Sequence, residues 1–219
     1  MLEKLVRLAL IGVMGATASF HNPDYLPGER AKIEVIINEG KLNPARAGVL
    51  IVDMQEDYLA NINQEELGEE LIPNQIKIIK YAQKNSIPIF VLEYDLRGPT
   101  TSSLIRVLEK GQYTVIRKDY DNGFRDTQLD EKLVDKKVNS IILMGVNASG
   151  CVKMTASGGY VRGYLVVTCP DLIANDTNYV DKQEGRTWYK NQGMWVESHK
   201  IILGVLESTN SQTFQKSFQ

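Results

Sequence analysis

The chain has 219 residues, 43% of them hydrophobic, and a formal net charge of −2 at pH 7. This length and composition can bury one full hydrophobic core and favour a single domain over two. The sequence has no basic stripe, zinc-finger spacing or interleaving of aromatic and basic residues, so we expect no nucleic-acid partner. Two cysteines and two histidines argue against a disulfide framework, a histidine-rich metal site and a Ser-His-Asp triad.

The first nineteen residues allow two interpretations. Lys4 and Arg7 precede an apolar run at residues 8–14, and residues 16–18 (ATA) have the small-x-small form of a signal-peptidase site. The same residues also form an amphipathic helical pattern. We expect a structural helix and a cytoplasmic protein, with export after cleavage of residues 1–18 as the alternative. The apolar run is too short to cross a bilayer, so no membrane partner is expected.

Residues 1–41 are interpreted as an N-terminal extension with one edge strand at 33–37, and residues 42–219 as the main domain. In that domain apolar runs alternate with helical patterns. The predicted strands are residues 49–52, 87–92, 113–116, 141–144 and 164–168. The predicted helices are residues 73–85, 101–110 and 129–136, and a helix that begins at Cys151. Residues 169–193 are interpreted as irregular, and a last apolar run occupies residues 201–206.

Strands that alternate with helices in this way require crossover connections. We therefore expect an α/β fold with three layers, α/β/α, around a mainly parallel, doubly wound sheet. Ligands of such sheets bind beyond the carboxyl ends of the strands. Asp53, Lys118 and Cys151 each lie at or just past the end of a predicted strand. Three chemically different groups are thus expected at one edge of the sheet.

Cys151 lies where a strand and a loop of small residues lead into a helix. The first turn of a helix points its free N–H groups and its positive dipole end outward, which favours a thiolate and lowers the pKa of a cysteine from about 8.5. Cys151 is therefore a candidate nucleophile, and the alternative is a small buried hydrophobic residue. Gly158 and Gly159 in the same helix are poor helix formers, and we expect them to pack closely against the sheet. Taken singly, Asp53 could be a capping carboxylate and Lys118 a solvated partner of Asp119.

Four segments, in this order and at this spacing, resemble the isochorismatase-like cysteine hydrolases. This family includes nicotinamidases and N-carbamoylsarcosine amidases. The segments are IVDMQEDYL with Asp53, LIPNQIKIIKYAQKNSIPIFVLEY, IRKDYDNGFRDTQLDEKL with Lys118 and Phe124, and GVNASGCVKMTASGGYVRGY with Cys151. The resemblance runs from about residue 42 to residue 206. It implies the isochorismatase-like version of the α/β/α fold and, by analogy, a homo-oligomer.

The resemblance also implies a catalytic triad of Asp53, Lys118 and Cys151. In this scheme Cys151 attacks a small amide or carbamoyl substrate to form an acyl-enzyme, and Asp53 takes the thiol proton and returns it to the leaving amine. Lys118 would balance the charge of Asp53 and of the developing thiolate. The family pattern further implies a cis Val146–Asn147 peptide bond. It also implies an oxyanion hole formed by the backbone N–H groups of Asn147 and Cys151.

The sequence departs from two branches of the family. Nicotinamidase-type members place an Asp and several His after the second strand to bind a metal. The corresponding segment here, EYDLRGPTTSS, has no histidine, so we expect no metal and no cofactor, and nicotinamide is disfavoured as the substrate. Isochorismatases proper carry Gly at the position of the nucleophile and hydrolyse a vinyl ether, and Cys151 argues against that chemistry. Vinyl ether hydrolysis and a non-catalytic binding domain of the same fold remain the alternatives.

The expected partner is a small-molecule substrate held near the triad. Its pocket is predicted to include Tyr58, Tyr94, Tyr120 and Phe124. Further candidates for the pocket are Glu93, Arg97, Asn147 and Tyr179.

Overall fold

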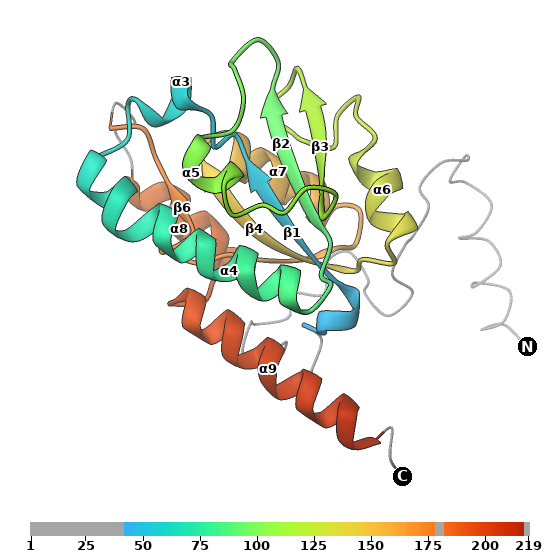
Figure 1. The fold of residues 1–219 in the computed structure, drawn as a ribbon. Coiled ribbons are helices and arrows are strands. Elements are labelled where there is room, and N and C mark those ends of the chain that lie inside the picture. The colour runs from blue at the N-terminus through green and yellow to red at the C-terminus, as the bar shows by residue number, and fades with distance from the viewer. Residues whose placement is uncertain (1–41, 178–181, 217–219) are drawn as a thin grey trace, which may run out of the picture.

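A computed structural model describes residues 42–177 and 182–216 and shows a parallel sheet between two layers of helices (Figure 1). The strands are β1 (Ala47–Val52), β2 (Ile89–Tyr94), β3 (Tyr113–Lys118), β4 (Ser140–Val146), β5 (Leu165–Val167) and β6 (Ile173–Ala174). Their order is β3-β2-β1-β4-β5, and β6 pairs with the carboxyl end of β4. All of these pairings are parallel. The mainly parallel α/β fold predicted from the sequence is confirmed.

Two central strands form the middle of the core. Every residue of β1 and β4 is buried, which explains why their sequences are continuously apolar instead of alternating. In the sheet Val52 is in register with Leu92 of β2 and with Gly145 of β4. Because these strands end at nearly the same level, the residues that follow them meet at one edge of the sheet.

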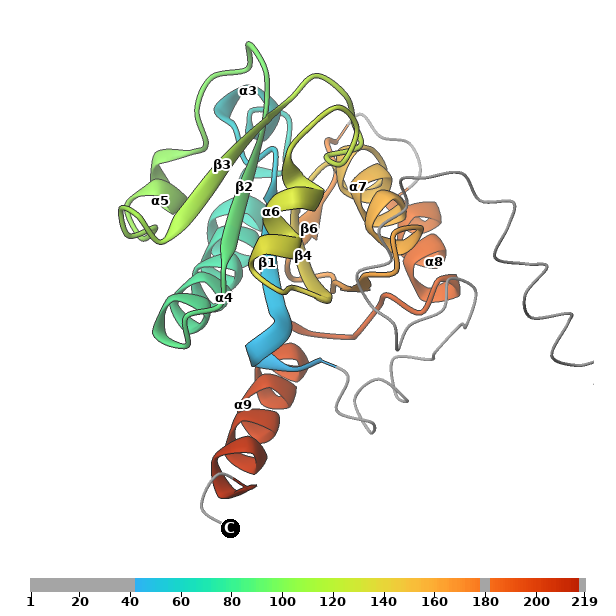
Figure 2. The ribbon, with the colours of Figure 1, turned by 90° about the vertical axis from the view of Figure 1, so that its right-hand side faces the viewer.

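Helices cover both faces of the sheet (Figure 2). One layer contains α4 (Ile72–Lys84), the single turn α5 (Ser102–Ile105) and α9 (His199–Lys216), and the other contains α6 (Leu129–Asp135), α7 (Cys151–Tyr160) and α8 (Lys182–Asn191). The 3-10 turn η1 (Pro44–Arg46) precedes β1. The connection from β1 to α4 contains α3 (Glu56–Leu59) and the π-helical segment η2 (Glu66–Leu71). The predicted start of α7 at Cys151 is confirmed.

Two segments differ from their prediction. The prediction of a helix over residues 101–110 is wrong beyond the first turn, α5. Residues 109–112 form a turn instead. In this turn the Gln112 N–H donates to the Glu109 carbonyl, and Gly111 has a φ of +86°. The irregular structure expected over residues 169–193 is also wrong, since β6 and α8 lie there. The sequence of α8, KQEGRTWYKN, is polar and contains a glycine, so its helical pattern is weak.

The two helical glycines of α7 pack differently from each other. A Cβ on Gly159 would lie 3.2 Å from the Val166 side chain and 3.4 Å from the Ile141 side chain, which confirms close packing against the sheet. A Cβ on Gly158 would instead lie 2.3 Å from Asn122 Oδ1, so this glycine makes room for the loop after β3 and not for the sheet.

The expectations for residues 1–41, including the N-terminal helix or signal segment and the edge strand at 33–37, lie outside the described residues, as does Tyr179. Within the described ranges, no helix combines the length and apolarity that a bilayer-spanning segment requires.

Candidate active site

Asp53 and Lys118 form a buried ion pair at the carboxyl ends of β1 and β3. Lys118 Nζ lies 2.8 Å from Asp53 Oδ2, and the exposed fractions of the two side chains are 0% and 1%. Asp53 has a φ of 51°, in the left-handed region that Asp tolerates better than most residues. Lys118 also donates to the Tyr120 carbonyl at 3.2 Å. The alternative of a solvated Lys118 paired with Asp119 is therefore wrong.

Cys151 is the first residue of α7 and is buried. Its Sγ lies 3.4 Å from Asp121 Oδ1. Burial raises the pKa of the Cys151 thiol, the negative charge of Asp53 raises it further, and the charge of Lys118 lowers it only in part. Burial and the charge of Asp53 thus outweigh the lowering of the pKa that was expected from the helix N-terminus. Cys151 is therefore a thiol at rest and needs a base to become a nucleophile.

Asp53 has the properties of such a base. Burial raises the pKa of its carboxyl group, while the charge and hydrogen bond of Lys118 and the interaction with the Cys151 side chain lower it in part. The net direction is upward. A carboxylate with a raised pKa near a thiol can accept that thiol's proton more readily than an exposed aspartate can.

The loop from β4 to α7 contains two backbone donors that have no acceptor among the described residues. The Val146–Asn147 peptide bond is cis, as predicted. Around it the N–H groups of Gly150 and Val152 both donate to the Asn147 carbonyl, at 3.0 and 3.1 Å. By contrast, the N–H groups of Asn147 and Cys151 donate to no other described residue. These are the two donors that the family resemblance implies for an oxyanion hole.

Segments from elsewhere in the chain hold this loop in place. The Ala148 N–H donates to the Ala174 carbonyl at 2.9 Å, and the Tyr189 hydroxyl donates to the Ala148 carbonyl at 2.7 Å. The Ser149 N–H donates to Asn175 Oδ1 at 2.8 Å. The residues just after β4 are therefore fixed by β6, the segment that follows it and α8.

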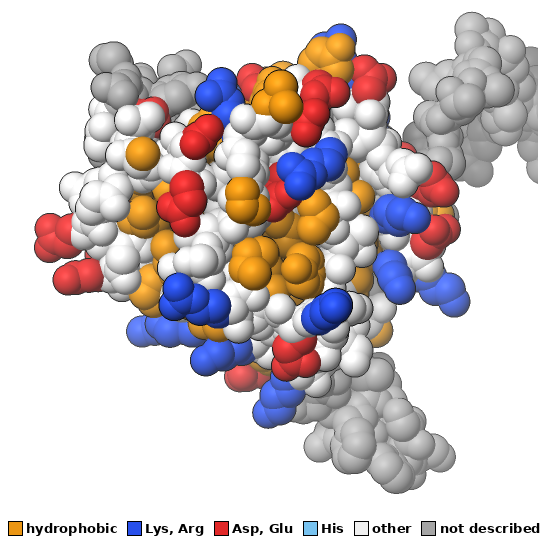
Figure 3. Space-filling view, turned by 45° about the horizontal axis from the view of Figure 1, so that its top comes forward, with side chains coloured by type: hydrophobic (Ala, Val, Ile, Leu, Met, Phe, Trp, Pro, Cys, Tyr) orange, Lys and Arg blue, Asp and Glu red, His pale blue; other side chains and the backbone are white. Residues whose placement is uncertain are grey.

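Tyr58 and Tyr94 lie beside the ion pair. Their rings meet edge to face, with centroids 6.3 Å apart. Burial raises the pKa of Tyr58, and the negative charge of Asp53 raises it further. Lys118 Nζ lies 4.2 Å from the centroid of the Tyr94 ring. Figure 3 shows the molecule with the top of the Figure 1 view tilted toward the reader. On this face, hydrophobic side chains gather among acidic and basic ones.

The side chains of the other residues predicted for the pocket have contacts outside the group of Asp53, Lys118 and Cys151. Phe124 is buried and packs against Tyr164, with ring centroids 5.8 Å apart, which gives it a packing role. Tyr120 is exposed, and the Arg125 guanidinium lies 3.7 Å from the centroid of its ring. Glu93 is buried and accepts hydrogen bonds from the N–H and hydroxyl of Thr100, at 2.7 and 2.8 Å, so it anchors a loop. Arg97 lies over Tyr58, 5.7 Å from the ring centroid.

Two polar residues at this edge escaped the sequence analysis. Asp121 contacts the Cys151 thiol across thirty positions of sequence. Gln55 is buried and holds Tyr94, whose N–H donates to Gln55 Oε1 at 2.8 Å and whose carbonyl accepts from Gln55 Nε2 at 3.0 Å. Gln55 lies two residues after Asp53 and could have been noticed for that reason. Asp121 gives no local signal of its contact.

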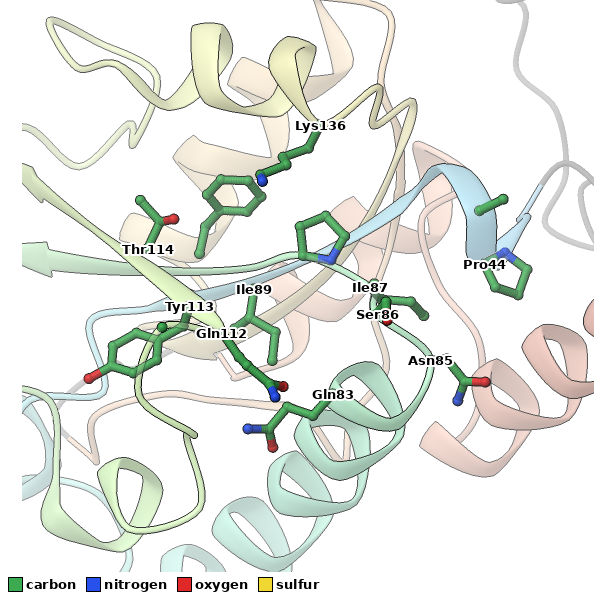
Figure 4. Close-up of a pocket in the computed structure, with 14 residues that line it drawn as sticks. Pro44, Gln83, Asn85, Ser86, Ile87, Ile89, Gln112, Tyr113, Thr114 and Lys136 are labelled. Carbon is green, nitrogen blue, oxygen red and sulfur yellow. The ribbon is translucent and has the colours of Figure 1, made fainter.

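A separate hollow of about 640 Å³ lies at the opposite end of the sheet, where β2 and β3 begin (Figure 4). Neutral side chains line most of it, including Gln83, Gln112 and Tyr113, and Lys136 is its charged member. Neither cysteine lines this hollow. Among the described residues, no group of three or more His, Cys, Asp or Glu side chains is arranged to hold a metal ion. Metal independence stays a prediction.

Comparison with known proteins assigns the chain to a family. Residues 47–196 match the isochorismatase domain. The chain is 25% identical over 146 residues to an isochorismatase family protein of Bacillus subtilis, covering 61% of this chain and 80% of that protein. It is 23% identical over 155 residues to nicotinamidase 3 of Arabidopsis thaliana, covering 60% of this chain and 75% of that enzyme.

Solved structures share the fold. The N-carbamoylsarcosine amidase of Thermoplasma acidophilum aligns with a TM-score of 0.61 at 17% identity, covering 70% of this chain and 96% of the amidase. The nicotinamidase of Staphylococcus aureus aligns with a TM-score of 0.61 at 22% identity, covering 70% and 99%. The domain match covers more than half of the sequence, so this chain belongs to the isochorismatase family of hydrolases.

Proposed function

We propose that this hydrolase cleaves a C–N bond of a small amide or carbamoyl substrate through Cys151, without a metal. The observation that carries the proposal is the buried Lys118–Asp53 pair, with 2.8 Å between Nζ and Oδ2, next to a buried thiol at the start of a helix. Relatives named as amidases and nicotinamidases support hydrolysis of an amide.

The reaction begins with proton transfer from Cys151 to Asp53. The sulfur then forms a bond to the substrate carbonyl carbon, and the carbonyl oxygen becomes an oxyanion that the N–H groups of Asn147 and Cys151 stabilise. The C–N bond breaks as Asp53 returns its proton to the leaving nitrogen. Water, deprotonated by Asp53, hydrolyses the thioester, and the proton passes back to the sulfur. Lys118 keeps one positive charge beside Asp53 throughout, which offsets the cost of a buried carboxylate.

A test combines turnover with detection of the intermediate. Ammonia release is measured over a panel of small amides and carbamoyl compounds, and acid-quenched protein is analysed by intact mass for an acyl adduct. Cys151→Ala should lose at least about a hundredfold in activity, since removing a nucleophile costs several orders of magnitude. Cys169→Ala is the matched control, because Cys169 is also a buried free thiol but lies outside the site.

The competing reaction is hydrolysis of a vinyl ether, which needs an acid but no nucleophile. It predicts that Cys151→Ala stays active and that no adduct forms. A non-catalytic domain predicts no turnover in either protein. Full activity of Cys151→Ala on any substrate would overturn the cysteine mechanism.

A further inference from the structure

Asp121 is an acidic residue that the proposed mechanism does not use. It follows β3 by three positions, and its Oδ1 lies 3.4 Å from Cys151 Sγ. Asp121 is exposed whereas Cys151 is buried, so the carboxylate approaches the nucleophile from the solvent side. The buried Thr155 of α7 fixes this loop, because its hydroxyl donates to the Asp121 carbonyl at 3.3 Å and accepts from the Gly123 N–H at 3.0 Å.

The charges around the nucleophile do not balance. Asp53 is paired with Lys118, and that pair is neutral. Within the described part of the chain, no Lys, Arg or His nitrogen comes within ion-pair distance of the Asp121 carboxylate. With Cys151 as a thiol, these four side chains together carry one net negative charge, and it resides on Asp121.

An unpaired carboxylate at this position disfavours a negative charge on the neighbouring sulfur. The negative charge of Asp121 adds to burial and to Asp53 in disfavouring the Cys151 thiolate. A positive group placed against Asp121 removes that repulsion and favours the thiolate. The aromatic rings of Tyr58 and Tyr94 at the same edge already attract cations of the chain, since Arg97 lies 5.7 Å from the Tyr58 centroid and Lys118 Nζ lies 4.2 Å from the Tyr94 centroid.

We propose that Asp121 selects a cationic substrate, namely a small amide that carries an ammonium, amidinium or guanidinium group close to the scissile carbon. The inference rests on the proposed function, because it takes Cys151 as the nucleophile. The cationic group pairs with Asp121 on binding and stays there while the S–C bond forms and the C–N bond breaks. It exchanges no proton with Asp121, and Asp53 alone handles the thiol and leaving-group protons.

The test measures charge selection at the sulfur without needing the substrate. Two methanethiosulfonates of similar size are used, one with an aminoethyl group and one with a sulfonatoethyl group. Each is attacked by the thiolate and releases methanesulfinate to leave a mixed disulfide. Peptide mass mapping gives the rate at Cys151 for each reagent at low salt, normalised to the rate with a free thiol.

The wild-type protein should favour the cationic reagent. In Asp121→Asn the cation-to-anion rate ratio should fall about tenfold, as removal of one unit charge a few ångströms away predicts. Asp121→Glu should keep most of the preference. The matched control is Asp126→Asn on the same loop, whose carboxylate is 74% exposed and pairs with Arg125, and its ratio should stay at the wild-type value. An unchanged ratio in Asp121→Asn, or a wild-type preference for the anionic reagent, overturns the proposal.

The cysteine mechanism and the selection of cations are refuted by different results. Full turnover by Cys151→Ala would remove the cysteine mechanism whatever the labelling ratio. An inactive Cys151→Ala combined with an unchanged ratio in Asp121→Asn would leave the cysteine mechanism standing and remove only the selection of cations.

Discussion

Lys118 Nζ lies 2.8 Å from Asp53 Oδ2 in an environment that excludes solvent from both side chains. A buried ion pair adds little net stability compared with apolar packing, because both charges lose their hydration. Removing one partner is costly, since the other charge is then buried alone. Stability alone therefore does not explain the pair, and the proposed role of Asp53 as a base beside Cys151 would.

The first prediction concerns Lys118→Met, which keeps the side-chain volume but removes the charge. Unfolding in urea at pH 8 should show a loss of about 3–5 kcal/mol, because Asp53 is left without its partner. The pKa of Asp53 is already raised by burial, and the loss of Lys118 raises it further. A carboxyl group with a raised pKa in the folded state costs stability as the pH rises, so the loss should be clearly smaller at pH 5.

Lys190→Met is the control for this prediction. Lys190 pairs with Glu197 at 3.5 Å on the surface, where the side chains are 52% and 74% exposed. Exposed pairs contribute about 0–1 kcal/mol, so the control should change little at either pH. Equal losses at pH 5 and pH 8 in Lys118→Met would contradict a charged Asp53 as the cause.

Much of this arrangement could be predicted from the sequence, because short-range patterns determine it. Continuous apolar runs identified β1 and β4, and the positions of Asp53, Lys118 and Cys151 at or just past the ends of strands indicated that they meet at one edge. Asp121 could not be predicted, because its contact with Cys151 depends on the course of the loop after β3. The pKa of Cys151 could not be predicted either, since it depends on burial and on the neighbouring carboxylates and not only on the helix end.

The second prediction separates the two effects of Asp53 on Cys151. Asp53→Asn removes the proposed base, so turnover should fall at least about a hundredfold. The same change removes a negative charge that raises the pKa of the Cys151 thiol, so alkylation of Cys151 by iodoacetamide at pH 8 should become severalfold faster. Peptide mass mapping distinguishes Cys151 from Cys169. Labelling that slows together with turnover would contradict the predicted effect of the Asp53 charge on the pKa of Cys151.

The third prediction tests how closely β4 must approach β1. Gly145 has a φ of +137°, and a Cβ there would lie 2.0 Å from the Val52 carbonyl oxygen. Gly145→Ala should therefore cost about 3 kcal/mol or more in urea unfolding, because the contact is with backbone that cannot rotate away. Gly204→Ala in α9 is the control, since nothing lies within 4 Å of the added methyl group. The control should gain up to about 1 kcal/mol, as alanine favours a helix over glycine. Equal effects would contradict the close approach.

The last prediction concerns Asp171, whose carboxylate holds the first residue of α9. Asp171 Oδ2 accepts from the His199 N–H at 3.0 Å and lies 2.6 Å from His199 Nδ1. Burial alone would raise the pKa of Asp171, but the hydrogen bonds from His199 lower it overall. Its contribution to stability is therefore present at neutral pH and lost as the pH falls through the folded-state pKa. Asp171→Asn should cost about 1–3 kcal/mol in urea unfolding at pH 7 and much less near pH 3. Asp126→Asn is the control, because it removes only an exposed pair with Arg125 and should change the stability little. A deficit in Asp171→Asn that is the same at pH 7 and pH 3 would mean that the amide fits poorly for reasons other than charge.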